Sequence, residues 1–154
     1  MPSRERRLTR DELLAALDAG WGRFLPTLAR LPDEEQTRYA RAQGYARAQD
    51  LLAHVSAWAE ETLAVANAIR QGGMIGEYDV DAFNAQAVER CRSWTRERVE
   101  AEFESAHAAL AALIAELPAK ALDDPNLHGW LVSTVVDHYE EHQPPDAPSL
   151  RATS

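Results

Sequence analysis

The chain has 154 residues, of which 45% are hydrophobic, and a formal net charge of -9. This length and composition predict one domain whose core is large enough to fold without disulfides or a structural metal. The single cysteine, Cys91, excludes an intramolecular disulfide and favours a reducing, cytoplasmic location. The acidic balance argues against nucleic acid and membrane surfaces as partners, and no segment approaches the roughly 20 apolar residues of a membrane span.

The first helix is predicted to begin at Thr9, which forms a capping box with Glu12. Apolar residues then recur at helical spacing as far as Leu31, and Pro32 ends the segment. Pro26 lies inside this stretch, so we expect the helix to kink there.

A second long helix is expected from about residue 48 to 71, ending at Gly72-Gly73, which can adopt the left-handed conformation of a C-cap. The segment from residue 72 to 80 is glycine-rich and irregular. Asp81 can then cap a short helix that runs to about residue 92. We expect this insert to cover one end of the bundle.

The third long helix is predicted from about Thr95 to Leu117, where Pro118 stops it. The fourth follows Asp124-Pro125 and ends before residue 144. No segment alternates with period two, so strands are not predicted. The pattern indicates an all-α four-helix bundle over residues 9–143, with a basic extension at 1–8 and a flexible tail at 144–154.

The fourth helix carries two histidines on its expected inward face. Leu131, Val135, His138 and His142 follow at steps of four, three and four residues, which is the spacing of one α-helical face. Because an unpaired buried polar group costs about 1–3 kcal/mol, these imidazoles must be hydrogen-bonded, bound to metal or close to water. Hydrogen-bonded core histidines, or histidines favoured at a helix C-terminus, fit the same spacing.

His54 favours the metal interpretation because it lies one turn after Leu51 and one turn before Trp58, where it can point into the bundle. Three neutral imidazoles from two helices would leave positions open for water or substrate and suit zinc, nickel or ferrous iron. We expect His107 to be a packing or rim residue and His128 to be an exposed residue at the start of the fourth helix.

Two polar residues lie one turn from His138. Thr134 precedes it by four positions and Glu141 follows it by three, so either can bind the ring nitrogen that does not hold a metal. A solvated helix face is the alternative for Glu141. Cys91 stands between two arginines but has no evident base, so we expect it to pack inertly.

Aromatic and amide side chains could form a pocket around the histidines. Trp58, Trp130 and Tyr139 can supply an apolar wall, although aromatic residues at helical spacing are more often core. Tyr139 could also donate a proton as a catalytic group. Tyr78 and Asn84, in or beside the insert, are candidate lid residues, with ordinary capping as the alternative.

Three sequence segments together resemble those of the DinB-like superfamily, and most closely those of its colibactin self-protection branch (ClbS/DfsB). The resemblance spans roughly residues 11–142 and rests on the segments Leu51–Trp58, Asp81–Asn84 and His138–His142. It implies an up-down-down-up four-helix bundle, often a homodimer, with a divalent metal, zinc or nickel, held by His54, His138 and His142. Relatives include S-transferases and isomerases that use a low-molecular-weight thiol, and proteins that inactivate a reactive natural product.

The sequence leaves three functions open. The leading one is an enzyme whose divalent cation activates a water or a thiol to attack a small electrophile, by hydrolysis or thiol transfer, in detoxification. A non-catalytic protein that sequesters a reactive small molecule in the bundle is the second. A stress-related scaffold acting through a helical dimer surface, which would not need the histidines, is the third.

Overall fold

Helices are the only regular elements in residues 7–145, 147 and 150, which the computed structural model describes. This confirms the all-α prediction. The elements in chain order are α2 (Arg10–Ala19), η1 (Trp21–Arg23), α3 (Phe24–Ala29), α4 (Asp33–Ala42), α5 (Ala48–Arg70), α6 (Val80–Arg90), α7 (Arg96–Glu116), α8 (Ala119–Leu122), α9 (Pro125–Val132), η2 (Ser133–Asp137) and α10 (His138–His142).

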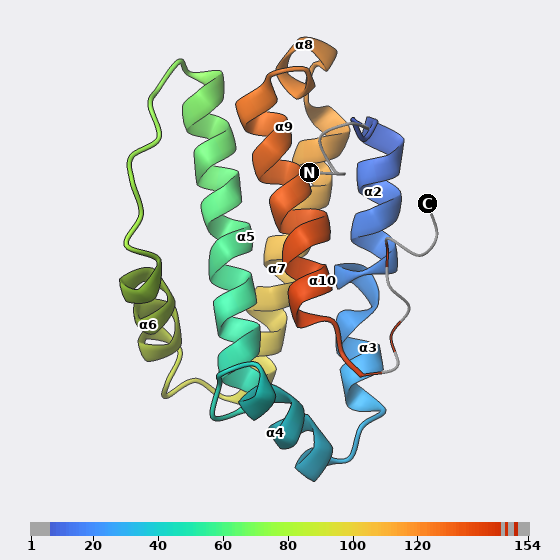
Figure 1. Cartoon of the computed structure of the whole chain (residues 1–154), viewed down its shortest axis with the longest axis vertical. Coiled ribbons are helices and arrows are strands. Elements are labelled where there is room, and N and C mark those ends of the chain that lie inside the picture. The colour runs from blue at the N-terminus through green and yellow to red at the C-terminus, as the bar shows by residue number, and fades with distance from the viewer. Residues whose placement is uncertain (1–6, 146, 148–149, 151–154) are drawn as a thin grey trace.

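The bundle consists of four long segments whose second and third members run in the same direction, which is the arrangement that the resemblance implies. The chain descends through α2 and α3, ascends through α5, ascends again through α7, and descends through α9, η2 and α10 (Figure 1). The two ascending helices, α5 and α7, pack against each other, and α2 contacts α7. α9 packs against α5, so the last segment and the second one are direct neighbours in the bundle.

The first segment starts as predicted but breaks earlier than predicted. Thr9 and Glu12 form the capping box, each side chain bonding the other's backbone N–H at 3.1 Å. The break falls at Gly20, where a Cβ would lie 3.0 Å from the ring of Tyr139. Pro26 causes no break because it lies in the first turn of α3, where a backbone N–H has no helical partner.

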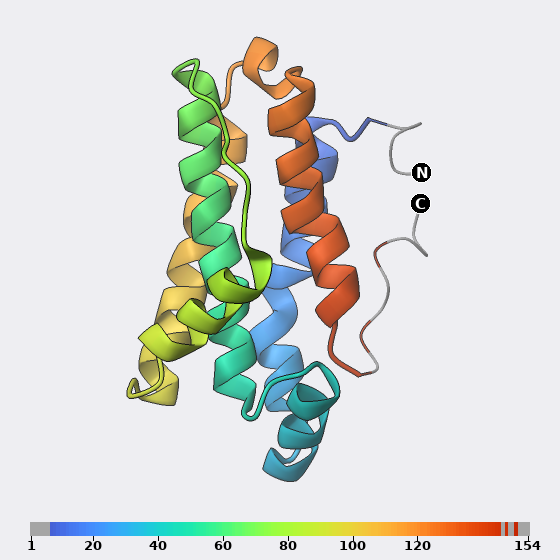
Figure 2. The same cartoon turned by 60° about the vertical axis from the view of Figure 1, so that its left-hand side comes forward.

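The insert after α5 differs from the prediction in its cap and its place. α5 ends as expected, with Gly72 at a φ of 76°. The cap of α6 is Asp79 rather than Asp81, because the Asp79 carboxylate accepts the N–H of Ala82. α6 lies along the side of α5 rather than over an end of the bundle, and the linking segment runs back beside α5 (Figure 2).

α4 was not predicted from the sequence. Its first turn is acidic, with three consecutive carboxylates that favour a helix N-terminus. Only Gln36, Tyr39 and Ala40 are buried in it, so it lacks the wide apolar stripe that marks the other helices. It packs against α5 and closes the lower end of the bundle in Figure 1.

The last two long segments begin at the predicted caps. Thr95 accepts the N–H of Arg98 to start α7, and Asp124 accepts the N–H groups of Asn126 and Leu127 to start α9. The fourth segment is not a continuous α-helix, because residues 133–137 form a π-helical turn. The histidines of α10 follow that turn directly.

Trp21 occupies the centre of the core, where four elements meet. Its ring contacts those of Phe24, Phe103 and Tyr139 at centroid distances of 5.2, 6.0 and 5.3 Å. The same core cluster contains further side chains that are at most 2% exposed: Leu13, Leu28, Leu51, Leu52, Val55, Val99, Leu110, Ile114, Leu117, Leu127, Leu131 and Val135. Burial of these residues supplies the main stabilisation of the bundle.

Much of the predicted extension at 1–8 and tail at 144–154 lies outside the described residues. Within the extension, Arg7 donates to the carbonyl of Leu122, and the carbonyl of Leu8 contacts His128. Leu150 packs against the core. None of the helices in the described ranges has the length and hydropathy that crossing a bilayer requires.

Candidate metal centre

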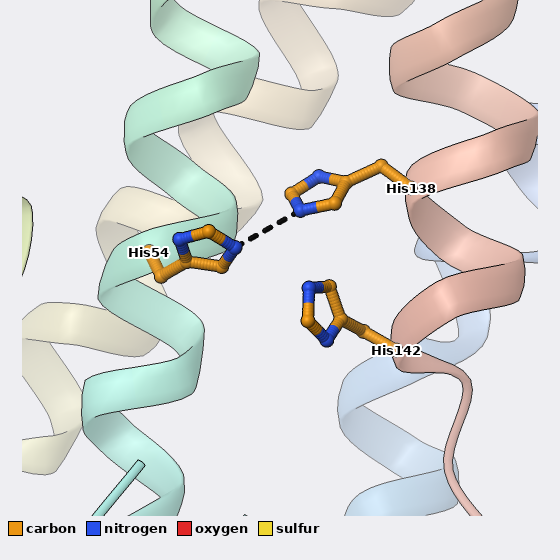
Figure 3. A group of neighbouring side chains, drawn as sticks. All are labelled: His54, His138 and His142. Carbon is orange, nitrogen blue, oxygen red and sulfur yellow. Dashed lines mark hydrogen bonds between the residues drawn. The ribbon is translucent and has the colours of Figure 1, made fainter. Parts of the chain in front are cut away.

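Three imidazoles meet between α5 and α10. His54 comes from α5, and His138 and His142 come from successive turns of α10, with all three rings facing one another (Figure 3). The ring centroids form a nearly equilateral triangle with sides of 5.0, 5.1 and 4.7 Å. One nitrogen from each ring lies within 4.8 Å of the others, so the group could hold a metal ion.

All three imidazoles are kept neutral by their surroundings. The pKa of His54 is lowered to about 4, mainly by burial and also by the neighbouring His142, against an opposing effect of Asn84. Burial also lowers the pKa of His138 strongly, reinforced by His54 and His142. The pKa of His142 is lowered by burial against the effect of Glu141. Neutral rings present the lone pairs that a metal ligand needs.

Individual nitrogen atoms of the cluster also suit a cation. The Nε2 atoms of His54 and His138 are 3.0 Å apart, which is a hydrogen-bond distance, so one of the two nitrogens carries the shared proton. A metal ion could take the place of that proton, because both nitrogens are potential ligands. Nδ1 of His142 donates to Oε1 of Gln43 at 2.9 Å, which fixes the tautomer that leaves Nε2 unprotonated. In the described part of the chain, the buried Nδ1 of His54 has no hydrogen-bond partner. The donor set therefore fits a divalent metal with nitrogen ligands.

α4 and the turn after it hold the last two turns of the bundle in place. Gln43 bonds the ring of His142, and the hydroxyl of Tyr39 donates to its backbone carbonyl. Tyr45 lies against the ring of His54 at a centroid distance of 5.0 Å. None of these residues was predicted to act at the site. A sequence signal that could have indicated Tyr39 and Gln43 is their four-residue interval, which places both on one helix face.

A cavity of about 550 Å³ opens beside His54 and His138. Asp137 and Glu141 are its charged lining residues, and no lysine or arginine of the described chain lines it. Its remaining lining residues are Trp58, Val80, Asn84, Pro125, Asn126, Gly129, Trp130, Ser133 and Thr134. This volume is typical of pockets for small molecules.

Two of the predicted pocket residues are joined by a hydrogen bond. The indole Nε1 of Trp58 donates to Oδ1 of Asn84 at 2.7 Å, which ties α5 to α6 beside the histidines. Tyr78 does not line the cavity, but its ring lies against Trp58 and Trp130, and its hydroxyl donates to Glu61. The insert therefore contributes Asn84 to the wall of the cavity, and Tyr78 packs behind the two tryptophans of that wall.

The two residues expected beside His138 have other contacts. The hydroxyl of Thr134 is 2.6 Å from that of Thr62 on α5. Glu141 is largely exposed, with its carboxylate 4.0 Å from Nε2 of His142. Both residues still line the cavity.

Tyr139 lies in the core rather than beside the cavity. It is 2% exposed, and its ring packs against Trp21 and Gly20. The continuous α-helix that was predicted here would put Val135 and His138 on one face. The π-turn makes Tyr139 the residue that follows Val135 in the core and leaves His138 free to face α5.

The two histidines outside the cluster are both buried. His128 was expected to be exposed, and this is wrong, since its Nε2 bonds the carbonyl of Leu8 at 2.9 Å. His107 packs between Trp21 and Phe103, with Nδ1 2.7 Å from the carbonyl of Phe103. Cys91 is buried, and burial raises the pKa of its thiol, which agrees with an inert packing role.

Comparison with known proteins identifies the family. The sequence profile described as the DinB superfamily matches residues 16–144, which run from the second half of α2 to the end of α10 and include the three clustered histidines. No curated protein and no solved structure gives a significant match.

Proposed function

This chain belongs to the DinB superfamily, and we propose that it is a metal-dependent enzyme that inactivates a small electrophile by hydrolysis or by transfer to a low-molecular-weight thiol. One observation carries the proposal: three neutral imidazoles from two helices converge beside a cavity of small-molecule size. A role in detoxification or self-protection, as in the ClbS/DfsB branch, is the biological context that we propose.

His54, His138 and His142 would hold the cation, with zinc or nickel preferred for an all-nitrogen donor set. A divalent cation supplies Lewis acidity there and lowers the pKa of a water or thiol nucleophile towards neutrality. The chain's own part is orientation. Gln43 keeps the proton of His142 on Nδ1, and burial keeps His54 neutral.

The cavity favours a substrate without anionic groups. Its charged lining consists of Asp137 and Glu141, so an anionic ligand would meet two carboxylates and no lysine or arginine within the described chain. Trp58 and Trp130 offer aromatic faces that suit apolar groups or a cationic nitrogen. We therefore propose a neutral or positively charged electrophile.

The test combines metal content with turnover. The purified protein, its His54→Ala variant and a His128→Gln control are assayed by mass spectrometry against neutral and cationic electrophiles, with and without added thiol. We expect about one equivalent of metal and product in excess of protein for the wild type and the control, and neither for His54→Ala. Turnover that survives both chelation and His54→Ala would contradict the proposal.

The second candidate function is sequestration of a reactive compound. The indole rings of Trp58 and Trp130, both in the cavity wall, would favour tight binding without any chemistry. The same mass spectrometry separates the two candidates, because sequestration returns the compound intact and in no more than stoichiometric amount.

A further inference from the structure

The π-turn at η2 interrupts the helix immediately before the metal centre. The N–H of His138 donates to the carbonyl of Ser133, five residues earlier, rather than to that of Thr134, four residues earlier. The carbonyl of Thr134 therefore does not receive the N–H of His138. It accepts the indole Nε1 of Trp21 at 2.9 Å in a buried contact.

Trp21 therefore donates to the carbonyl that the backbone of His138 would use in an unbroken α-helix. Winding residues 133–138 as an α-helix would require the His138 N–H to bond the carbonyl of Thr134. The indole of Trp21 already bonds that carbonyl, and displacing the indole would leave its buried N–H without an acceptor. Trp21 is itself fixed by packing on Phe24 and Phe103, so the bond comes from a rigid donor.

A second contact ties the same turn to the helix of His54. The hydroxyl of Thr62 on α5 donates to the carbonyl of Trp58 at 2.9 Å, so the hydroxyl of Thr134 donates to Thr62 over 2.6 Å. Thr62 has no exposed surface. This buried pair fixes η2 against α5, the element that supplies the third imidazole.

The extra residue in the turn decides which side chains face the cluster. Each residue of an α-helix turns the chain by about 100°, so the same sequence without the π-turn would rotate everything after it by about that angle relative to α9. The turn keeps the core positions at steps of four, Leu127, Leu131, Val135 and Tyr139, each at most 2% exposed. It also directs His138 and His142 towards His54 (Figure 3).

We propose that Trp21 and the Thr62–Thr134 hydroxyl pair are positioning residues that hold the π-turn and so aim His138 and His142 at His54. Neither Trp21 nor Thr62 is among the three proposed ligands. Their effect on metal binding rests on the proposed function, whereas their effect on the orientation of the rings does not.

The first test removes the indole donor. Trp21→Phe keeps an aromatic ring but lacks the N–H, and Trp94→Phe, on the loop between α6 and α7, is the matched control. With Co²⁺ as the probe metal and chelator competition as the assay, we expect Trp21→Phe to bind at least about tenfold more weakly and to alter the Co²⁺ absorption spectrum. Trp94→Phe should match the wild type.

The second test uses variants of Thr62, so it applies even if Trp21→Phe does not fold. Thr62→Val removes the hydroxyl with little change of shape, Thr62→Ser restores it, and Ser56→Ala removes another buried hydroxyl of α5 as a control. We expect Thr62→Val to weaken Co²⁺ binding and Thr62→Ser to recover it. Wild-type affinity and spectrum in Thr62→Val would overturn the proposal.

A readout on the metal-free protein separates this proposal from the proposed function. The imidazole nitrogen resonances of His138 and His142 report the contacts of those rings, including the bond to Gln43. If the wild type binds no Co²⁺, the proposed function fails. The positioning proposal then stands if the resonances shift in Trp21→Phe and Thr62→Val, and falls if they stay unchanged.

Discussion

His107 makes the metal-free protein sensitive to acid. It is buried, and burial lowers its pKa from 6.5 to about 4, against a small opposing effect of the Phe103 carbonyl. Below pH 6.5 the unfolded chain therefore takes up a proton that the folded chain does not, and stability falls as the pH falls towards 4. At about 1.4 kcal/mol per pH unit, His107 alone removes about 2 kcal/mol by pH 5.

The substitution His107→Leu tests this value. The variant should unfold with a similar free energy to the wild type at pH 7, and should be more stable by about 2 kcal/mol at pH 5. Urea unfolding of chelator-treated protein, followed by far-UV circular dichroism at both pH values, measures the difference. Equal losses of stability in the two proteins between pH 7 and pH 5 would refute the reasoning.

Three further outcomes follow from particular contacts. Gln43→Leu removes the acceptor that orients His142, so metal affinity measured by chelator competition should fall about tenfold, and unchanged affinity would count against the assigned tautomer. Gly20→Ala places a methyl group 3.0 Å from the ring of Tyr139 and should lower the free energy of unfolding in urea by about 1–3 kcal/mol. An unchanged free energy of unfolding would show that the Tyr139 ring can move aside without cost. Cys91 should react with a thiol reagent only after unfolding, because it is buried and its pKa is raised; rapid labelling of native protein would contradict this.

Local signals in the sequence located most of the helix ends. The capping box at Thr9, the glycine after α5, and the caps Thr95 and Asp124 each satisfy backbone groups within a few residues. Such contacts depend on sequence neighbours alone, so they can be read without a fold. α4 was missed because its stability comes from packing a narrow apolar face against α5.

The positions of the breaks depend on tertiary contacts that the sequence does not reveal. Gly20 is the break in the first segment because Tyr139, distant in sequence, packs against it. Pro26 was the more obvious local signal for a helix break. Because the helix already breaks at Gly20, Pro26 lies in the first turn of α3, where a proline is tolerated. His128 was expected to be exposed because the contact with the carbonyl of Leu8 spans more than a hundred residues.

The three clustered histidines could be found from spacing and resemblance, but their surroundings could not. The interval between His138 and His142 keeps both on one face whether or not a π-turn precedes them. The place of Tyr139 does depend on the π-turn, which is stabilised by Trp21 from another helix. Gln43 likewise bonds the ring of His142 from the end of α4, a helix that carries no sequence motif.

Anomalous diffraction from crystals grown with zinc or nickel is the most direct test of the metal centre. The account predicts one peak between α5 and α10, about 2.0–2.2 Å from a nitrogen of His54, His138 and His142, and its absence in His54→Ala crystals. A metal-replete crystal with no peak at that point, or with a peak that persists in His54→Ala, would contradict the three-histidine centre.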